Sequence, residues 1–425
     1  MENLFQLFYA SSGVCTDTRK IKVNSLFVAL KGANFNGNAF AKEAIIQGAK
    51  FAIVDEEGFS DDQSIFYVPD ALQFLQSLAN FHRRKFNIPL IGVTGSNGKT
   101  TTKELINCVL SRKYKTLCTT GNLNNHIGVP LTLLDLNENH EIAIIEMGAN
   151  KPGDIKELVE IAEPDFGIIT NIGKAHLQGF IDLNGVIKTK AELFDFIKTL
   201  NTGAVFYNAD DSIIAGLCLG FSKKHNYGTS SESAVKGELL ELNPYVRFKW
   251  SVNNYESEII QTNLVGSYNF YNFLAAISIG NYFGVTKTEI NSAIQAYTPT
   301  NNRSQVVRTE KNSLIVDCYN ANPSSMISAL QSFIENTQVN KLAILGDMLE
   351  LGNESIHEHQ KVIDCCIQND LNFVTIGKIF KELNPAGYES VSQLQNEINS
   401  NPLVNYSILL KGSRGIALEK LIDIL

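Results

Sequence analysis

The stretch that decides the fold is Thr94-Gly95-Ser96-Asn97-Gly98-Lys99-Thr100-Thr101, which directly follows the apolar run Pro89-Leu90-Ile91-Gly92-Val93. A strand, a glycine-rich turn and a helix in this order can surround phosphate oxygens with backbone N–H groups, and the helix dipole points its positive end at them. Lys99 can reach the transferred phosphate, and the Thr100 hydroxyl can ligate Mg²⁺. Gly95 replaces the earlier glycine of the strict pattern, so this is a variant P-loop. The stretch predicts a protein that uses ATP, and the alternative is a plain glycine-rich turn.

The length and composition of the chain indicate how many domains it has and what kind of partner it binds. The chain has 425 residues, of which 44% are hydrophobic, and about 150 residues per domain predicts about three domains. The net charge is −8 and the pI is about 5.5. No run of Lys or Arg supplies the basic patch of a nucleic-acid binder, so we expect small-molecule partners and no nucleic acid.

No apolar stretch approaches the roughly 20 residues that a membrane helix requires, and the first six residues lack a basic leader. We therefore expect a cytoplasmic protein with no membrane partner. The seven cysteines show no C-x-x-C spacing, and the neighbours Cys365 and Cys366 lie in a helix-like segment. They are expected to be reduced core residues rather than zinc ligands.

Short apolar runs alternate with segments of helical period, which is typical of parallel sheets covered by helices on both faces. We predict an α/β fold whose strands are Leu90–Val93, Ile142–Glu146, Gly167–Thr170, Ala204–Tyr207, Leu314–Asp317, Leu342–Leu345, Phe373–Ile376 and Ser407–Lys411. Ligands of doubly wound sheets bind at the carboxyl ends of strands. The polar residues placed there are Glu146, Asn171, Asp317, Asp347 and Lys411.

Two segments carry the composition of linkers, Arg83-Arg84-Lys85 and Thr298-Pro299-Thr300. They divide the chain into predicted domains 1–85, 86–298 and 299–425.

Several further motifs, in this order along the chain, carry a resemblance to a known family. They are the P-loop, Glu146-Met147-Gly148-Ala149-Asn150, Thr170-Asn171-Ile172-Gly173-Lys174-Ala175-His176 and Lys190-Ala191-Glu192. Together they resemble the ATP-dependent Mur ligases of peptidoglycan synthesis. Two later segments, 317–323 and 345–352, resemble the branch that adds D-alanyl-D-alanine to UDP-N-acetylmuramoyl-tripeptide.

The resemblance implies a small N-terminal α/β domain that binds the UDP-sugar and a central P-loop domain with a doubly wound, mostly parallel sheet. It implies a C-terminal Rossmann-like α/β domain for the ATP ribose and the incoming dipeptide. In this family ATP phosphorylates a carboxylate, the amine attacks the resulting acyl phosphate, and phosphate leaves. No protein nucleophile is required, so the protein must mainly position its reactants and screen phosphoryl charge.

The resemblance also implies two Mg²⁺ ions. One is placed on Thr100 and Glu146, and the second near His176 and a carbamylated Lys190. The carbamate turns an ammonium group into an oxygen ligand that suits a hard cation. Without the resemblance, Lys190 would be interpreted as a solvated residue of an amphipathic helix, and His176 as a core or loop histidine.

The nucleotide site implied by the resemblance comprises Thr94, Gly95, Ser96, Asn97, Gly98, Lys99, Thr100, Thr101, Asn269, Asn272, Arg303 and Asp317. The two asparagines face the adenine side, Arg303 reaches the γ-phosphate and Asp317 binds the ribose. Catalytic roles fall to Lys99, His176, Lys190 and Arg303. Tyr268 stands in place of a common histidine, and Asn302 in place of a glycine.

The implied substrate contacts lie in three parts of the chain. Residues Thr16, Asp17, Thr18 and Arg19 match the uridine-diphosphate segment, although Asn36-Gly37-Asn38 replaces the more frequent Asp-Gly-His. Asn124 and Asn125 match the loop that faces the peptide, and Asn320 and Asn322 lie in the segment implied for the dipeptide.

Two other functions stay open at this point. Another amide ligase, such as the diamino-acid-adding Mur ligase or folylpolyglutamate synthase, would share the P-loop but lack the motifs at 317–323 and 345–352. A P-loop protein that hydrolyses ATP only to change shape would need Lys99 and Thr100 but no carbamylated lysine. We expect a monomer.

Overall fold

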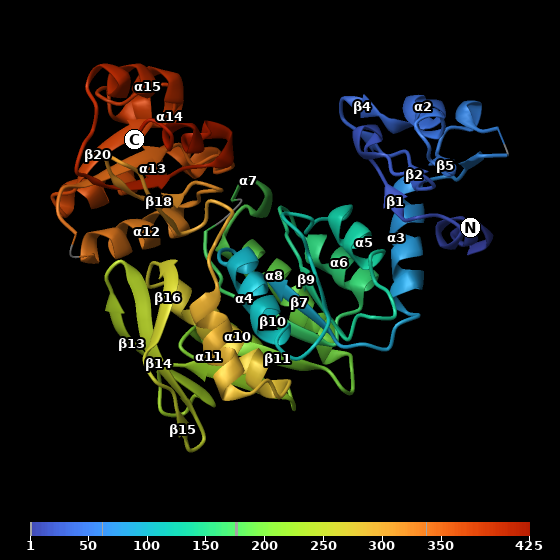
Figure 1. The fold of residues 1–425 in the computed structure, drawn as a ribbon, viewed down its shortest axis with the longest axis horizontal. Helices are drawn as coiled ribbons and strands as arrows, with labels where there is room; N and C mark the ends of the chain where they lie inside the picture. Colours follow the sequence, from blue (N-terminus) through green and yellow to red (C-terminus); the bar gives the residue numbers. More distant parts are fainter. Residues whose placement is uncertain (1, 62, 175–176, 337) are drawn as a thin grey trace. The chain divides into compact units, whose positions relative to one another are not determined.

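The computed structural model describes residues 2–61, 63–174, 177–336 and 338–425 (Figure 1). The chain forms two compact units. The first comprises Met1–Gly92, Tyr114–Gly148 and Asp154–Asp165, and the second comprises Val93–Lys113, Ala149–Gly153 and Phe166–Leu425. In the part of the chain that is described, none of the helices has the length and apolar character needed to cross a membrane.

The first unit begins with a parallel four-stranded sheet in the order β1-β2-β5-β6 and a two-stranded ribbon of β3 and β4. The strands are β1 (Val14–Cys15), β2 (Leu26–Val28), β3 (Lys31–Gly32), β4 (Phe35–Asn36), β5 (Phe51–Val54) and β6 (Ile65–Tyr67); the helices are α1 (Phe5–Tyr9), α2 (Ala41–Ile46) and α3 (Ala71–Arg83). Their small core centres on Phe27, Ala52 and Val54. Asp70 begins α3 by accepting a hydrogen bond from the Gln73 amide.

The rest of the first unit contains β8 (Thr116–Cys118), α5 (Gly128–Leu133), β9 (Ile142–Glu146) and α6 (Asp154–Ala162), with β8 and β9 parallel. The end of α3 is fixed to this part. The buried Arg83 guanidinium donates to the Ala162 carbonyl at 3.2 Å, and Arg84 pairs with Glu163. The segment at 83–85, expected as a linker, is therefore anchored within this unit.

Strand β7 (Leu90–Thr94) leads into the second unit, and all five of its residues are buried. The Thr170 amide donates to the Thr94 carbonyl at 2.9 Å, so the end of β10 lies beside the end of β7. From β10 the strands continue in the order β10-β11-β12-β13-β14-β15, with β16 on β14; the pairs from β10 to β13 are parallel and the later pairs antiparallel.

The bounds of these strands are β10 (Phe166–Ile169), β11 (Ala204–Asn208), β12 (Lys224–Gly228), β13 (Val235–Leu242), β14 (Tyr245–Val252), β15 (Tyr255–Glu256) and β16 (Ile260–Val265). The accompanying helices are α4 (Lys99–Leu110), α7 (Leu177–Phe180), α8 (Leu183–Lys198), α9 (Ser212–Leu217), α10 (Asn269–Tyr282) and α11 (Lys287–Ala296). Helix α10 is apolar on nearly all sides because it packs against α4, α11 and the strands β11 to β14.

The C-terminal part of the second unit is a sheet in the order β17-β18-β21-β19-β20, parallel except for β17. Its elements are β17 (Gln305–Arg308), β18 (Ser313–Asp317), α12 (Pro323–Glu335), β19 (Lys341–Gly346), α13 (Ser355–Gln368), β20 (Asn372–Ile376), α14 (Lys378–Leu383), α15 (Val391–Ser400) and β21 (Ser407–Lys411). Alternate residues of β19 and β21 enter two separate cores, one under α12, α13 and α14 and the other under α15. Both faces of this sheet are therefore covered.

The eight strands expected from the sequence are all present, with ends within two residues of the expectation. The strands of the first sheet were not predicted because most have two or three residues. Antiparallel β14 was also missed, although Val246, Phe248, Trp250 and Val252 are buried in strict alternation with less buried neighbours. Cys365 and Cys366 lie in α13, and all seven cysteines are free thiols.

Candidate functional site

The predicted P-loop connects β7 to α4. Gly95 has φ +147° and Gly98 has φ +74°, and the first helical residue is Lys99. A Cβ on Gly95 would lie 2.0 Å from Thr170 Oγ1, and one on Gly98 would lie 2.9 Å from Asn272 Oδ1. Among the described residues, none caps α4 with its side chain. The loop thus brings backbone close to its surroundings and presents a helix N-terminus, as phosphate binding requires.

Lys99 lies over the loop that it follows. Its Nζ donates to the carbonyls of Gly95 at 2.8 Å and Ser96 at 3.2 Å. Thr100 and Thr101 are buried in the first turn of α4. The ammonium group is therefore held at the mouth of the cradle, within reach of an anion bound there.

The residues after β10 hold the loop from the neighbouring strand. Asn171 accepts from the Asn97 amide at 3.0 Å and donates from Nδ2 to the Asn97 carbonyl at 2.9 Å. Thr170 Oγ1 donates to the same carbonyl at 2.6 Å, and the Ser96 amide donates to the Asn171 carbonyl at 3.0 Å. Asn171, expected at a ligand, has its side chain engaged in supporting the P-loop.

The two asparagines predicted for the adenine side are both buried on α10. Asn272 Oδ1 accepts from Thr102 Oγ1 at 3.0 Å, and Asn272 Nδ2 donates to Asn269 Oδ1 at 2.8 Å. Asn269 Nδ2 in turn donates to the Val265 carbonyl at 2.7 Å. The structure thus brings this pair against the P-loop helix, as a linked network.

Asn322 connects the C-terminal residues to the P-loop. Its Oδ1 caps α12 by accepting from the Ser325 amide at 2.9 Å, and its Nδ2 donates to Asn97 Oδ1 at 2.7 Å. Asn320 Oδ1 accepts from the amide of the next residue at 2.9 Å. Of the two asparagines predicted for the dipeptide, Asn322 therefore contacts the nucleotide loop.

Arg303 lies just before β17, and Asp317 is the last residue of β18. The Arg303 guanidinium stacks on the Tyr319 ring, with Cζ 3.8 Å from the ring centroid. Asp317 accepts from the Ser304 amide at 3.2 Å and from Lys411 Nζ at 2.7 Å. Lys411, a strand-end residue, is buried and neutralises this carboxylate.

The segment before Arg303 is attached to the P-loop helix. Glu104 on α4 accepts from the Tyr297 hydroxyl at 2.6 Å and from Asn301 Nδ2 at 3.0 Å. Burial, with Glu104 adding to it, raises the pKa of the Tyr297 phenol, so the hydroxyl stays a donor. This carboxylate therefore holds both ends of the short segment 298–300.

The predicted metal ligands are distributed over both units. Lys190 is buried on α8, with Nζ 5.8 Å from the Phe180 ring centroid, so it is not the solvated lysine that its helix alone would suggest. Glu146 belongs to the first unit, where its Oε1 accepts from Asn124 Nδ2 at 2.7 Å. His176 lies outside the described residues. Within the described ranges, no group of three His, Cys, Asp or Glu side chains has the arrangement of a metal site.

The predicted uridine-diphosphate segment lies in the first unit. Asp17 caps the short turn at Thr18–Lys20 and forms a two-point ion pair with Arg19, at 2.9 and 2.8 Å. The side-chain bond from Arg19 lowers the pKa of Asp17 to about 2. Nearer the end of the unit, Asn125 Oδ1 accepts from the Gly128 amide at 2.8 Å and begins α5.

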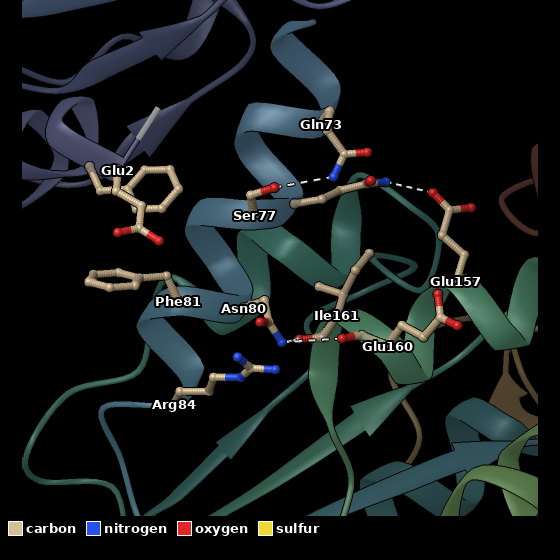
Figure 2. Close-up of a pocket in the computed structure, with 11 residues that line it drawn as sticks. Glu2, Gln73, Ser77, Asn80, Phe81, Arg84, Glu157, Glu160 and Ile161 are labelled. Carbon is tan, nitrogen blue, oxygen red and sulfur yellow. Dashed lines mark hydrogen bonds between the residues drawn. The ribbon is translucent and has the colours of Figure 1, made fainter.

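A pocket of about 570 Å³ also lies in the first unit, between α3, α6 and the N-terminal residues (Figure 2). Figure 2 shows Gln73 bonded to Ser77, and Asn80 bonded to the main chain beside Glu160 and Ile161. Gln76 Nε2, also in the wall, donates to Glu157 at 2.6 Å. None of the predicted site residues lines this pocket.

Sequence analysis named Lys174 and Asp347 but did not predict the contacts by which they support the site. Lys174 donates from its amide to Ser324 Oγ at 2.9 Å and from Nζ to Glu358 at 2.8 Å. Asp347, expected near a ligand, accepts from the amides of Ile379 and Phe380 and so anchors the start of α14. No local pattern pairs residues so far apart, and the only available signal was the position of Asp347 at a strand end.

The chain matches three consecutive parts of one family. Residues 11–83 match "Mur ligase family, catalytic domain", residues 93–280 match "Mur ligase middle domain" and residues 302–419 match "Mur ligase, glutamate ligase domain". It is 33% identical over 429 residues to the UDP-N-acetylmuramoyl-tripeptide–D-alanyl-D-alanine ligase of Bacillus subtilis, covering 96% of this chain and 92% of that one.

Solved structures agree with this match. The crystal structure of MurF from Acinetobacter baumannii superposes with a TM-score of 0.87 at 28% identity, over 99% of this chain and 97% of that one. The MurF ligase of Thermotoga maritima, solved in complex with ADP, gives a TM-score of 0.85 at 23% identity, over 100% and 98%, and shows the shared fold. The predicted three-domain α/β fold class is confirmed.

Proposed function

Because this chain belongs to the Mur ligase family, we propose that it is an ATP-dependent ligase that joins D-alanyl-D-alanine to UDP-N-acetylmuramoyl-tripeptide. The product is a precursor of peptidoglycan. The relatives that carry this name are 30–34% identical, and the Bacillus subtilis protein matches over nearly the whole length of both chains. The observation that carries the proposal is the P-loop, which is supported by Asn171 and contacted by Asn322 at the start of α12.

Amide formation requires an activated carboxylate, and a γ-phosphoryl group supplies the activation. The tripeptide carboxylate attacks the γ-phosphorus of ATP, ADP leaves, and an acyl phosphate results. The amine of D-alanyl-D-alanine then attacks the acyl carbon, and the tetrahedral intermediate expels phosphate. Each step builds or moves negative charge, so positioned cations and backbone N–H groups supply the catalysis.

The chain's own residues have distinct parts in this proposal. The loop from Gly95 to Gly98 and the start of α4 hold the phosphates, and Lys99 shifts from its carbonyl partners to the transferred group. Asn269 and Asn272 face the adenine side, Asp317 binds the ribose, and Arg303 neutralises the γ-phosphate. Asp17 and Arg19, with Thr16 and Thr18, take the uridine diphosphate. Asn124 and Asn125 face the peptide, and Asn320 and Asn322 the incoming dipeptide.

Mg²⁺ belongs to the proposal as a cofactor. The proposed ligands are Thr100 and Glu146 for one ion, and His176 with a carbamylated Lys190 for the second. Their donors fit a hard cation, since Thr100 is a hydroxyl at the start of the P-loop helix, Glu146 is a carboxylate, and a carbamate offers oxygens. Bound there, the ions would neutralise phosphate charge. The burial of Lys190 supports a role inside the protein rather than at the solvated surface.

The remaining parts of the proposal concern organisation. We take the functional domains as 1–85, 86–298 and 299–425, and the protein as a cytoplasmic monomer. Sedimentation velocity of the purified chain tests the monomer, and limited proteolysis followed by mass spectrometry tests the domain limits.

A phosphate-release assay tests the function. UDP-N-acetylmuramoyl-tripeptide, D-alanyl-D-alanine, ATP and Mg²⁺ should together give phosphate and the pentapeptide product in equal amounts, and omission of the dipeptide should stop product formation. Turnover with UDP-N-acetylmuramoyl-dipeptide and a diamino acid would instead identify another Mur ligase. ATP hydrolysis that is indifferent to every acceptor would identify a P-loop ATPase.

A further inference from the structure

The turn that carries Arg303 has an unfavourable backbone conformation. Asn302 has φ +56° and Ser304 has φ +50°, so two of the three residues from 302 to 304 lie in the left-handed region without being glycine. Such residues persist only where their surroundings hold them. The contacts of this turn therefore show what fixes the position of Arg303.

Ser304 is the point at which the turn is held. It is buried, its amide donates to Asp317 Oδ1 at 3.2 Å, and its Oγ lies 2.8 Å from the Tyr268 hydroxyl. The other oxygen of Asp317 is bound by Lys411. A single chain of contacts thus runs from Tyr268 through Ser304 to the carboxylate proposed for the ribose, with Arg303 one residue away.

The Tyr268 side chain is itself well fixed. It precedes the first residue of α10, and its ring packs against the core beneath α12 and α13. Burial raises the pKa of the phenol well above its ordinary value, with the Asp317 charge adding to the effect, so the hydroxyl is present at neutral pH. The Arg303 guanidinium stacks on Tyr319, but its buried Nε has no hydrogen-bond partner among the described residues, so the turn contributes to holding this side chain.

We propose that Tyr268 is a positioning residue, whose hydroxyl holds Ser304 and thereby sets Arg303 and Asp317 in the geometry that receives the nucleotide. The inference rests on the proposed function, since it assigns the turn to the ATP side of the site. Tyr268 acts through Ser304, and so its loss should weaken nucleotide binding without removing a catalytic group.

The test is a double-mutant cycle with nucleotide binding as its readout. Titration calorimetry with the non-hydrolysable analogue AMP-PNP and Mg²⁺ is applied to Tyr268→Phe, Ser304→Ala and the double variant. Tyr271→Phe is the matched control. It also removes one tyrosine hydroxyl from the N-terminal end of α10, and that hydroxyl donates to Asp210 at 3.2 Å instead of bonding to Ser304. We expect Tyr268→Phe and Ser304→Ala each to raise Kd by about 3-fold to 10-fold, as for one lost hydrogen bond. The double variant should match the single variants, and the control should stay within about twofold of wild type.

Ligation kinetics and melting temperature complete the test. We expect the KM for ATP to rise in Tyr268→Phe while the KM for the dipeptide stays unchanged, and the melting temperatures of Tyr268→Phe and Tyr271→Phe to agree within about 3 °C. Additive effects in the double variant, or equal Kd values in Tyr268→Phe and the control, would overturn the inference. Wild-type protein that binds AMP-PNP but forms no amide would refute the proposed function. The AMP-PNP titrations of the variants would still test whether Tyr268 positions the turn.

Discussion

Replacement of Gly98 by alanine would test the geometry of the phosphate cradle directly. The new Cβ would lie 2.9 Å from Asn272 Oδ1 and 3.2 Å from Asn272 Nδ2, at a φ of +74°. Asn272 cannot turn away freely, because Thr102 holds its oxygen and Asn269 holds its nitrogen. The substitution therefore either distorts the loop or breaks this network.

The expected cost has two parts. A left-handed alanine costs about 1 kcal/mol relative to glycine, and two displaced side-chain hydrogen bonds cost about 1 kcal/mol each. Together they should lower stability by about 3 kcal/mol, which corresponds to a fall of about 6–12 °C in the melting temperature of a cooperative unit the size of the predicted domain 86–298. Because the displaced atoms adjoin the phosphate cradle, AMP-PNP binding should weaken at least about tenfold, the equivalent of 1.4 kcal/mol.

Gly121→Ala is the matched control for this substitution. Gly121 has φ +57° and is exposed, and a Cβ there would meet nothing within 4 Å, so only the backbone cost of about 1 kcal/mol applies. Differential scanning fluorimetry and calorimetric titration compare the two variants. If the melting temperatures of both variants fall by the same amount and Gly98→Ala still binds AMP-PNP with the wild-type Kd, a Cβ at position 98 does not disturb Asn272 as expected.

Three further predictions concern single side chains. Lys99→Ala should lower the ligation rate by about 10³-fold with little change in melting temperature, because the lysine acts on phosphate charge; near wild-type ligation would contradict the P-loop assignment. Lys190→Ala should be nearly inactive and regain part of its ligation rate in formate or acetate, which supply a carboxylate ligand; full activity without the added acid would remove the proposed carbamate. Burial lowers the pKa of His359 from its ordinary 6.5, so the unfolded chain takes up a proton that the folded chain does not. The free energy of unfolding should therefore fall as the pH drops below about 6.5. It should continue to fall until the pH reaches the lowered pKa of His359 in the folded protein. Urea unfolding at about pH 7.5 and 5.5 measures this, and a His359→Gln variant that keeps the full pH dependence in this range would assign the effect to other groups.

The sequence predicted the parts of the fold that have a local signal. Strands such as Ile142–Glu146 and Ser407–Lys411 lie where expected, because their continuous apolar runs, of four and three residues, are bounded by polar residues and indicate buried strands. The two-residue strand Val14–Cys15 has no such signal, since its pairing with Leu26–Val28 depends on tertiary contacts. The alternation of apolar and polar residues in β14 is a local signal that indicates a strand with one buried face.

The candidate site divides in the same way. The P-loop is continuous in sequence, and its glycines and Lys99 could be identified from their spacing alone. Asn97 and Asn322 are 225 residues apart, and Tyr268 and Ser304 are 36 residues apart. These contacts arise only when separate helices and strands pack, so no sequence window contains both partners. Asp347 shows that a strand-end carboxylate can also hold the start of a helix, a contact that its position in the sequence does not reveal.

The Glu104 carboxylate has a mechanical consequence for the C-terminal residues. Glu104 accepts hydrogen bonds from both Tyr297 and Asn301. The segment between these two residues has four Cα–Cα steps, so it spans at most about 14 Å when fully extended. Glu104 lies about 8 Å along the helix from Lys99, since each residue of α4 advances 1.5 Å. The Glu104 carboxylate therefore limits how far Arg303, two residues beyond the second anchor, can move away from helix α4.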